Sequence, residues 1–212
     1  MLVYSDGSVK QALAARPALD REASATLAAK LFPGEQLEPL ADADLWSTSP
    51  PDAELTVGCF PGVALIAARE FGIDYPSKLP TRFLDPSLGS VVHLHAMHSV
   101  TDWCAFAVWE NGKLLRSLSV SPDNGAMEDL GTRFEFEQPY WAGQHPAGDS
   151  EEAEDYPLPF HPLELSEAAL LGFFGFEYEG TEGSSPLVTP EEIPLLRFKR
   201  SKPTKPAWWK FW

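Results

Sequence analysis

The residues best suited to chemistry are three histidines in the middle of the chain, which follow the pattern H-x-H-x-x-H over residues 93–98. Imidazole nitrogens are common zinc ligands, and they also take up and release protons near neutral pH. In an extended strand successive side chains point to opposite faces, so we expect His93 and His95 on one face and His98 on the other. Two imidazoles on one face can begin a zinc site, but a catalytic zinc needs a third protein ligand.

That third ligand would have to come from elsewhere in the chain, and the candidates are Asp102, His145 and His161. The histidine spacing superficially matches the motif of the metallo-β-lactamase superfamily. That motif has an aspartate directly before its last histidine, where this chain has Met97, and the glycine-bearing α/β/β/α pattern of the superfamily is absent. We therefore transfer no activity. We interpret the histidines first as hydrogen-bonded residues at a strand end, with a zinc site as the alternative.

The sequence lacks the short motifs of the common nucleotide and hydrolase folds. It contains no G-x-x-x-x-G-K-[ST] phosphate loop, no G-x-G-x-x-G dinucleotide fingerprint and no G-x-S-x-G nucleophile elbow. These absences argue against the common nucleotide folds. We lean toward a protein without enzymatic activity, and we expect no bound cofactor apart from zinc in the alternative interpretation.

The end of the chain differs in composition from the rest. Residues 197–212 hold six of the 16 basic residues and no acidic residue, whereas residues 1–196 carry 10 basic and 31 acidic residues, a net charge of −21. This asymmetry predicts a single acidic domain over residues 1–196 and a basic, tryptophan-rich tail over residues 197–212. Pro203 and Pro206 disfavour a helix in that tail.

The aromatic side chains of the tail expose apolar surface unless something covers them. They can fold back onto the acidic body, anchor a protein partner as tryptophans often do, or rest at the headgroups of an anionic membrane. The segment is short and has no amphipathic period, which argues against the membrane. The residues that we predict to bind a partner are Lys205, Trp208, Trp209, Lys210, Phe211 and Trp212.

Composition is that of a soluble globular protein, with 44% hydrophobic and 22% charged residues in 212. The net charge of −15 repels phosphate backbones, so we expect no nucleic-acid partner. No secretion signal and no apolar run of about 18 residues is present, which predicts no transmembrane segment and a cytoplasmic location, or a peripheral one at the inner membrane.

The two cysteines, Cys59 and Cys104, lie among apolar neighbours, and we predict that both are buried free thiols.

The elements that position these residues are clearest in the centre of the chain. Residues 91–98, 103–109 and 114–120 indicate strands, and Asn111-Gly112 is the strongest short signal for a type I′ hairpin. Pairing across that turn predicts the cross-strand pairs Glu110–Lys113, Trp109–Leu114, Val108–Leu115 and Ala107–Arg116.

Flanking segments are less regular. A helix over residues 20–31 begins at the cap Asp20, residues 35–54 indicate a loop, residues 134–137 alternate as in a strand, and Ser166 can cap a short helix. We therefore predict an α+β fold, a mainly antiparallel sheet with a central hairpin and a few packed helices.

Six segments carry a family resemblance: LVYSDG (2–7), LHAMHSV (94–100), FAVWE (106–110), RSLSVSPD (116–123), PYWAG (139–143) and YPLPFHPLEL (156–165). In these the chain resembles an uncharacterised family of actinobacterial proteins, a domain of unknown function. The resemblance implies kinship and a bacterial cytosolic origin, and it implies no activity. It also implies that the shared histidines are His95, His98 and His161, while His93 and the tail lie outside the pattern.

Our leading hypothesis is a non-enzymatic interaction protein whose tail docks on a protein partner or an anionic surface. The alternative is a metal-dependent hydrolase that uses His95, His98 and His161 to hold zinc. Small size and negative charge also suggest a third class, a toxin-neutralising protein.

Overall fold

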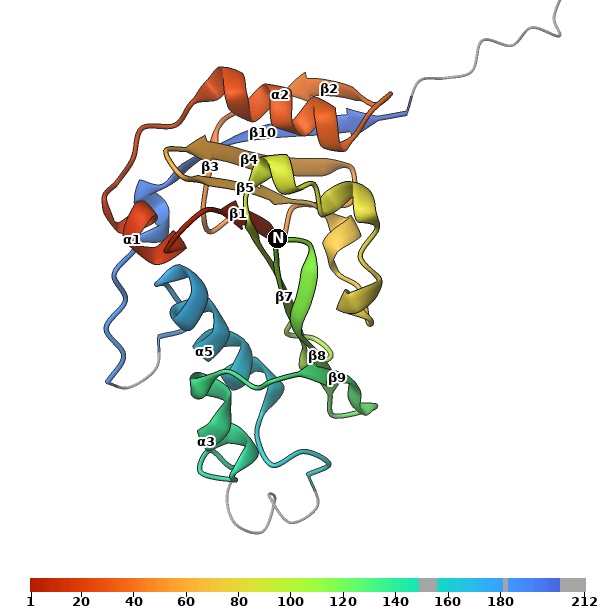
Figure 1. Cartoon of the computed structure of the whole chain (residues 1–212), viewed down its shortest axis with the longest axis vertical. Helices are drawn as coiled ribbons and strands as arrows, with labels where there is room; N and C mark the ends of the chain where they lie inside the picture. Colours follow the sequence, from red (N-terminus) through yellow and green to blue (C-terminus); the bar gives the residue numbers. More distant parts are fainter. Residues whose placement is uncertain (149–155, 181–182, 203–212) are drawn as a thin grey trace, which may run out of the picture.

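The computed structural model of the chain describes residues 1–148, 156–180 and 183–202 (Figure 1). The strands are β1 (Leu2–Ser5), β2 (Gln36–Pro39), β3 (Ala43–Asp44), β4 (Glu54–Phe60), β5 (Val63–Ala67), β6 (Val91–His98), β7 (Trp103–Glu110), β8 (Lys113–Ser121), β9 (Gly125–Gly131) and β10 (Pro194–Ser201). The α-helices are α1 (Val9–Ala14), α2 (Arg21–Leu31), α3 (Gln138–Trp141) and α5 (Pro162–Phe174). Short 3-10 turns are η1 (Arg69–Phe71), η2 (Pro76–Lys78), η3 (Thr81–Phe83), η4 (Pro86–Leu88), η5 (Glu135–Glu137) and η6 (Pro190–Glu192).

One large sheet organises the molecule. Its strand order is β2-β10-β4-β5-β1-β6-β7-β8-β9, β3 pairs with β10 beside this path, and every pairing is antiparallel. The predicted α+β class with a mainly antiparallel sheet is therefore confirmed.

Helices cover both faces of the sheet because the strands alternate apolar side chains between them. In β1, Leu2 and Tyr4 point into a cluster with α2 and the turns η1 to η3. Val3 points to the opposite face, into a cluster with α1 and α5. A third cluster lies where α3 and α5 pack on β7 and β8. Figure 1 shows these two helices in the lower part of the view, beside β7, β8 and β9.

The central hairpin forms at the predicted turn, with φ of 49° at Asn111 and 75° at Gly112. The first two predicted pairs, Glu110–Lys113 and Trp109–Leu114, are confirmed. The next two are wrong, because a β-bulge at Leu115 shifts the register. Val108 then pairs with Arg116, and Ala107 with Ser117.

The bulge turns Arg116 into the interior, where its side chain is fully buried. Its Nη2 donates to Glu137 Oε2 at 2.6 Å, and its Nη1 donates to Asp129 Oδ1 at 2.6 Å. A buried guanidinium needs such partners, because desolvation without them is costly. Arg116 thereby holds Glu137 against β8.

Residues 134–137 are not the predicted strand. Residues 135–137 form the turn η5, which brings the buried Glu137 carboxylate to the arginine. The rings of Phe134 and Phe136 do not alternate across a sheet but stack on each other with centroids 5.9 Å apart. Both rings also meet Phe173 of α5.

Two other predicted boundaries and the predicted burial of one cysteine change. The segment predicted as a loop over residues 35–54 contains the short strands β2 and β3. Helix α5 starts at Pro162 with His161 as its N-cap, one turn before Ser166, and ends at Phe174, where Gly175 is the C-cap with φ of 81°. Both cysteines are free, and Cys104 is buried whereas Cys59 is only partly buried.

The predicted tail begins inside the sheet, because Arg197–Ser201 belong to β10. Arg197 Nε donates to Glu54 at 2.6 Å, and the Arg200 guanidinium bonds both Glu35 and Glu70 at 2.8 Å and 2.6 Å. The acidic body therefore holds the start of the basic segment by ion pairs. Among the residues that the structure describes, no helix is long and apolar enough to cross a membrane.

The antiparallel order places many strand ends along one end of the sheet. The end of β10, the start of β4, the end of β5, the start of β1, the end of β6 and the start of β7 follow one another there. The residues next to these ends form the candidate site.

Candidate functional site

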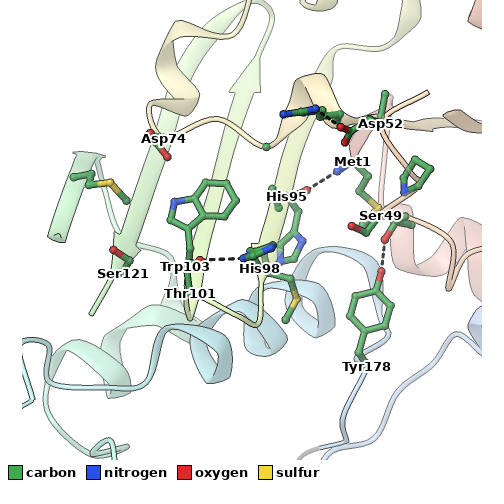
Figure 2. Close-up of a pocket in the computed structure, with 18 of the residues that line it drawn as sticks. Met1, Ser49, Asp52, Asp74, His95, His98, Thr101, Trp103, Ser121 and Tyr178 are labelled. Atoms are coloured by element: carbon green, nitrogen blue, oxygen red, sulfur yellow. Dashed lines mark hydrogen bonds and ion pairs between the residues drawn. The ribbon is translucent and has the colours of Figure 1, made fainter. Parts of the chain in front are cut away.

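A cavity of about 870 Å³ opens at this end of the sheet. It exists because β1 is short: its first residue, Leu2, pairs with Leu94, and β6 runs on to His98 without β1 beside it. The cavity occupies this gap between the end of β5 and the end of β6, and Figure 2 shows its lining. The loop before β4 and the turn between β8 and β9 close its sides.

The base of the cavity consists of groups that are neutral at pH 7. The α-amino group of Met1 donates to the backbone oxygen of His95 at 2.6 Å, and burial lowers the pKa of this amine to about 5. The His95 ring is 3% exposed, and its Nε2 lies 3.1 Å from the backbone oxygen and 2.9 Å from the Oγ of Ser166 on α5. Burial lowers the pKa of the His95 imidazole to about 3.

Carboxylates dominate the charge of the walls. Asp52, Asp74 and Asp123 line the cavity with their side chains exposed, and Arg69 is the one arginine or lysine among the described lining residues. Arg69 forms an ion pair with Asp52. No ion pair of Asp74 or Asp123 occurs within residues 1–148, 156–180 and 183–202. Because the base is neutral, the cavity carries net negative charge.

Aromatic side chains stand at both ends of the cavity. Trp46 and Tyr178 lie together at one end, with ring centroids 5.1 Å apart. Tyr75 and Trp103 also line the cavity, and Figure 2 shows Trp103 on the opposite side from Tyr178. Trp46 is 38% and Tyr75 is 46% exposed, so both rings are accessible from solvent.

Tyr75 already contacts a cation on one face, since Lys78 Nζ lies 4.5 Å from its ring centroid. Exposed aromatic rings attract ammonium and guanidinium groups through their electron-rich faces. Together with the unpaired carboxylates, these rings make the cavity suited to a ligand that is both cationic and aromatic.

The structure does not bring the three predicted metal-binding histidines together. His95 is buried against α5, and the exposed His98 bonds Thr101 through Nδ1 at 3.0 Å. His161 caps α5, where its Nδ1 accepts from the backbone nitrogen of Leu163 at 3.3 Å. Within the described parts of the chain, no three histidine, cysteine, aspartate or glutamate side chains form a group that could hold a metal ion. The alternative hydrolase is therefore not supported.

The other candidate metal ligands do not complete a site within the described residues. Asp102 Oδ2 lies 3.7 Å from His161 Nε2, and the ring of His145 stacks on Tyr140 with centroids 4.3 Å apart. His93 packs against Phe173 of α5. The strand alternation is confirmed, because His93 and His95 face α5 together while His98 is exposed.

The predicted partner-binding residues are Lys205, Trp208, Trp209, Lys210, Phe211 and Trp212, and they lie outside the described residues. Sequence reasoning singled out His95 and His98, which line the cavity, but it did so as candidate metal ligands. It did not find the aromatic and acidic residues of the lining, which come from several separate segments. A signal for these was the aromatic and acidic stretch around Trp46, in a segment predicted to be irregular.

The fold and the cavity define an α+β protein with one mainly antiparallel sheet and a polar cavity at its end. The chain belongs to a family of unknown function, DUF6928, whose model matches residues 1–198. No curated protein and no solved structure matched the chain. The resemblance to an uncharacterised family is thus confirmed, and the actinobacterial cytosolic origin stays a prediction.

Proposed function

We propose that this chain is a non-enzymatic interaction protein that binds a basic, aromatic segment of a protein partner in the cavity. The observation that carries the proposal is that Asp74 and Asp123, which form no ion pair within the described residues, line the same cavity as the rings of Tyr75 and Trp103. A lysine or arginine gains from both, because a carboxylate supplies charge and an aromatic face supplies cation–π attraction.

The arrangement of the histidines also favours binding over catalysis. Ser166 Oγ and His95 Nε2 are 2.9 Å apart, a distance suitable for a serine activated by a base. Both side chains are buried, however, and Ser166 does not line the cavity. The pair therefore serves to attach α5 to β6.

The sequence-based expectation that the tail docks on a protein partner or an anionic surface belongs to the same proposal. Nothing in the described residues favours a membrane as the surface, whereas the cavity favours a cationic peptide. A peptide ligand is also consistent with a cavity of about 870 Å³, which falls within the range of small-ligand sites.

Isothermal titration calorimetry with two blocked tetrapeptides tests the proposal. The sequences Lys-Trp-Trp-Lys and Glu-Trp-Trp-Glu match in size and aromatic content and differ in charge. We expect binding of the lysine peptide alone, weakened several-fold by Asp74→Asn and by added salt, because the attraction is electrostatic. Glu110→Gln is the matched control, since it removes one exposed carboxylate from the end of β7 that points away from the cavity. Equal binding of both peptides, or equal loss in both variants, would refute the proposal.

A further inference from the structure

We propose that the segment that fills the cavity is the C-terminal segment of the same molecule, residues 203–212, so that the protein masks its own tail until a partner displaces it. This inference rests on the proposed function, because it names the occupant of the same cavity. Three observations lead to it: the place where β10 ends, the length of chain that follows it, and the opposite charges of the cavity and of residues 203–212.

The first observation is that β10 ends close to the cavity. The Arg200 backbone nitrogen donates to the oxygen of Ala53 at 2.6 Å, and Ala53 follows the cavity-lining residue Asp52. The Arg200 guanidinium bonds Glu70 at 2.6 Å, and Glu70 follows the cavity-lining residue Arg69. Arg200, next to the last residue of β10, therefore contacts the sequence neighbours of two residues that line the cavity.

The second observation is the length of the segment. The order β10-β4-β5-β1 puts the end of β10 three strand positions from Met1 at the base of the cavity. At about 4.8 Å per strand, this separation is on the order of 15 Å. Ten extended residues reach about 33 Å, so the segment 203–212 is long enough to enter the cavity from its own β10.

The third observation is chemical complementarity. The segment contains Lys205 and Lys210 beside the indoles of Trp208, Trp209 and Trp212, and it has no acidic residue. The cavity offers the carboxylates of Asp74 and Asp123, which form no ion pair with the part of the chain that the structure describes, together with the aromatic side chains at each of its ends. The cationic and aromatic groups of the segment thus match the anionic and aromatic groups of the walls.

Tethering favours the same molecule over a second copy. A short flexible link gives a local concentration in the millimolar range, which exceeds the concentration of free copies in most solutions. A tail bound in this way competes with any outside peptide for the cavity. A partner that binds either the cavity or the tail would release the other for interaction.

Carbodiimide cross-linking of the full chain, followed by peptide mass spectrometry, tests the contact. We expect links from Lys205 or Lys210 to Asp74 or Asp123, in monomer and with a yield that is independent of protein concentration. The double variant with Trp208→Ala and Trp209→Ala should lose these links several-fold. Links that occur only between two copies, or tail links spread evenly over the exposed acidic residues, would overturn the inference.

The lysine tetrapeptide distinguishes a failure of this inference from a failure of the proposed function. The Trp208→Ala and Trp209→Ala variant should bind the peptide on the order of tenfold more tightly than the unaltered chain, because the internal competitor is weakened. Equal affinity of the two proteins would refute the tail as occupant while leaving the cavity as a peptide site. Absence of binding to both proteins would refute the proposed function, and with it the present inference.

Discussion

The buried imidazole of His95 should make the protein sensitive to acid. Burial lowers the pKa of this ring from 6.5 to about 3, so the folded protein keeps it neutral. As the pH falls, the unfolded chain binds the proton first. The neutral His95 ring therefore contributes fully to the free energy of unfolding above pH 6.5, and this contribution is lost as the pH falls from 6.5 toward about 3.

The size of the effect follows from the shift. One proton changes the free energy of unfolding by about 1.4 kcal/mol for each pH unit within that window. Over two pH units below 6.5 the loss from His95 is about 3 kcal/mol, which is a large share of the 5–15 kcal/mol typical of a domain. The lowered pKa values of His93, about 4, and of the Met1 amine, about 5, act in the same direction.

Urea unfolding between about pH 7 and pH 4.5 measures this loss. We expect His95→Gln to show a shallower pH dependence than the unaltered protein, by about 1.4 kcal/mol per pH unit, because glutamine does not titrate. His98→Gln is the matched control, since His98 lies in the same strand and is exposed. If the unaltered protein and His95→Gln lost stability in parallel, the buried neutral imidazole would not be the cause.

Three further predictions concern stability and can be checked by urea or thermal unfolding. Gly131→Ala should lower the free energy of unfolding by more than about 2 kcal/mol, because φ is +85° and a Cβ there would overlap a backbone carbonyl of β8. Gly112→Ala, at the open turn, is the control and should lower it by about 1 kcal/mol. Equal losses in the two variants would contradict this reasoning. Glu137→Gln should lower the free energy of unfolding by about 3 kcal/mol, because the buried guanidinium of Arg116 then keeps Asp129 as an ion-pair partner but loses the buried one. Adding Arg116→Met should recover part of that loss, and additive losses would contradict this. A tag fused ahead of Met1 should lower the melting temperature, because the extra residues would enter the cavity and replace the buried α-amino group. An unchanged melting temperature would argue against the burial of this amino group at the base of the cavity.

Local sequence signals predicted the centre of the fold well. Asn111-Gly112 specified a type I′ turn because both positions need positive φ, and the strands on either side followed from their apolar runs. The bulge at Leu115 was not predictable from the pattern, since it is stabilised by a distant partner. The bulge turns Arg116 into the interior, where it forms its ion pair with Glu137, a residue 21 positions further along the chain.

The histidines show the same division. Alternation along residues 91–98 placed His95 and His98 on opposite faces, as the structure confirms. Their spacing suggested a metal site, but the final partners of these side chains are Ser166 and Thr101. The spacing of residues along one strand determines which face of the sheet each side chain occupies, but not which residues of other elements approach it. It therefore could not decide whether each histidine binds a metal or forms a hydrogen bond.

The sequence by itself determined the fold class, the central turn and the separation of charge between an acidic body and a basic end, because each depends on residues close together in the chain or on composition. Tertiary structure alone decided that β1 starts too late to cover the end of β6 and that β10 ends beside the resulting gap. The carboxylates and rings of the cavity meet there through strand order, which brings together segments separated by up to about 130 residues. No local pattern encodes that proximity, because it results from the pairing of the whole sheet.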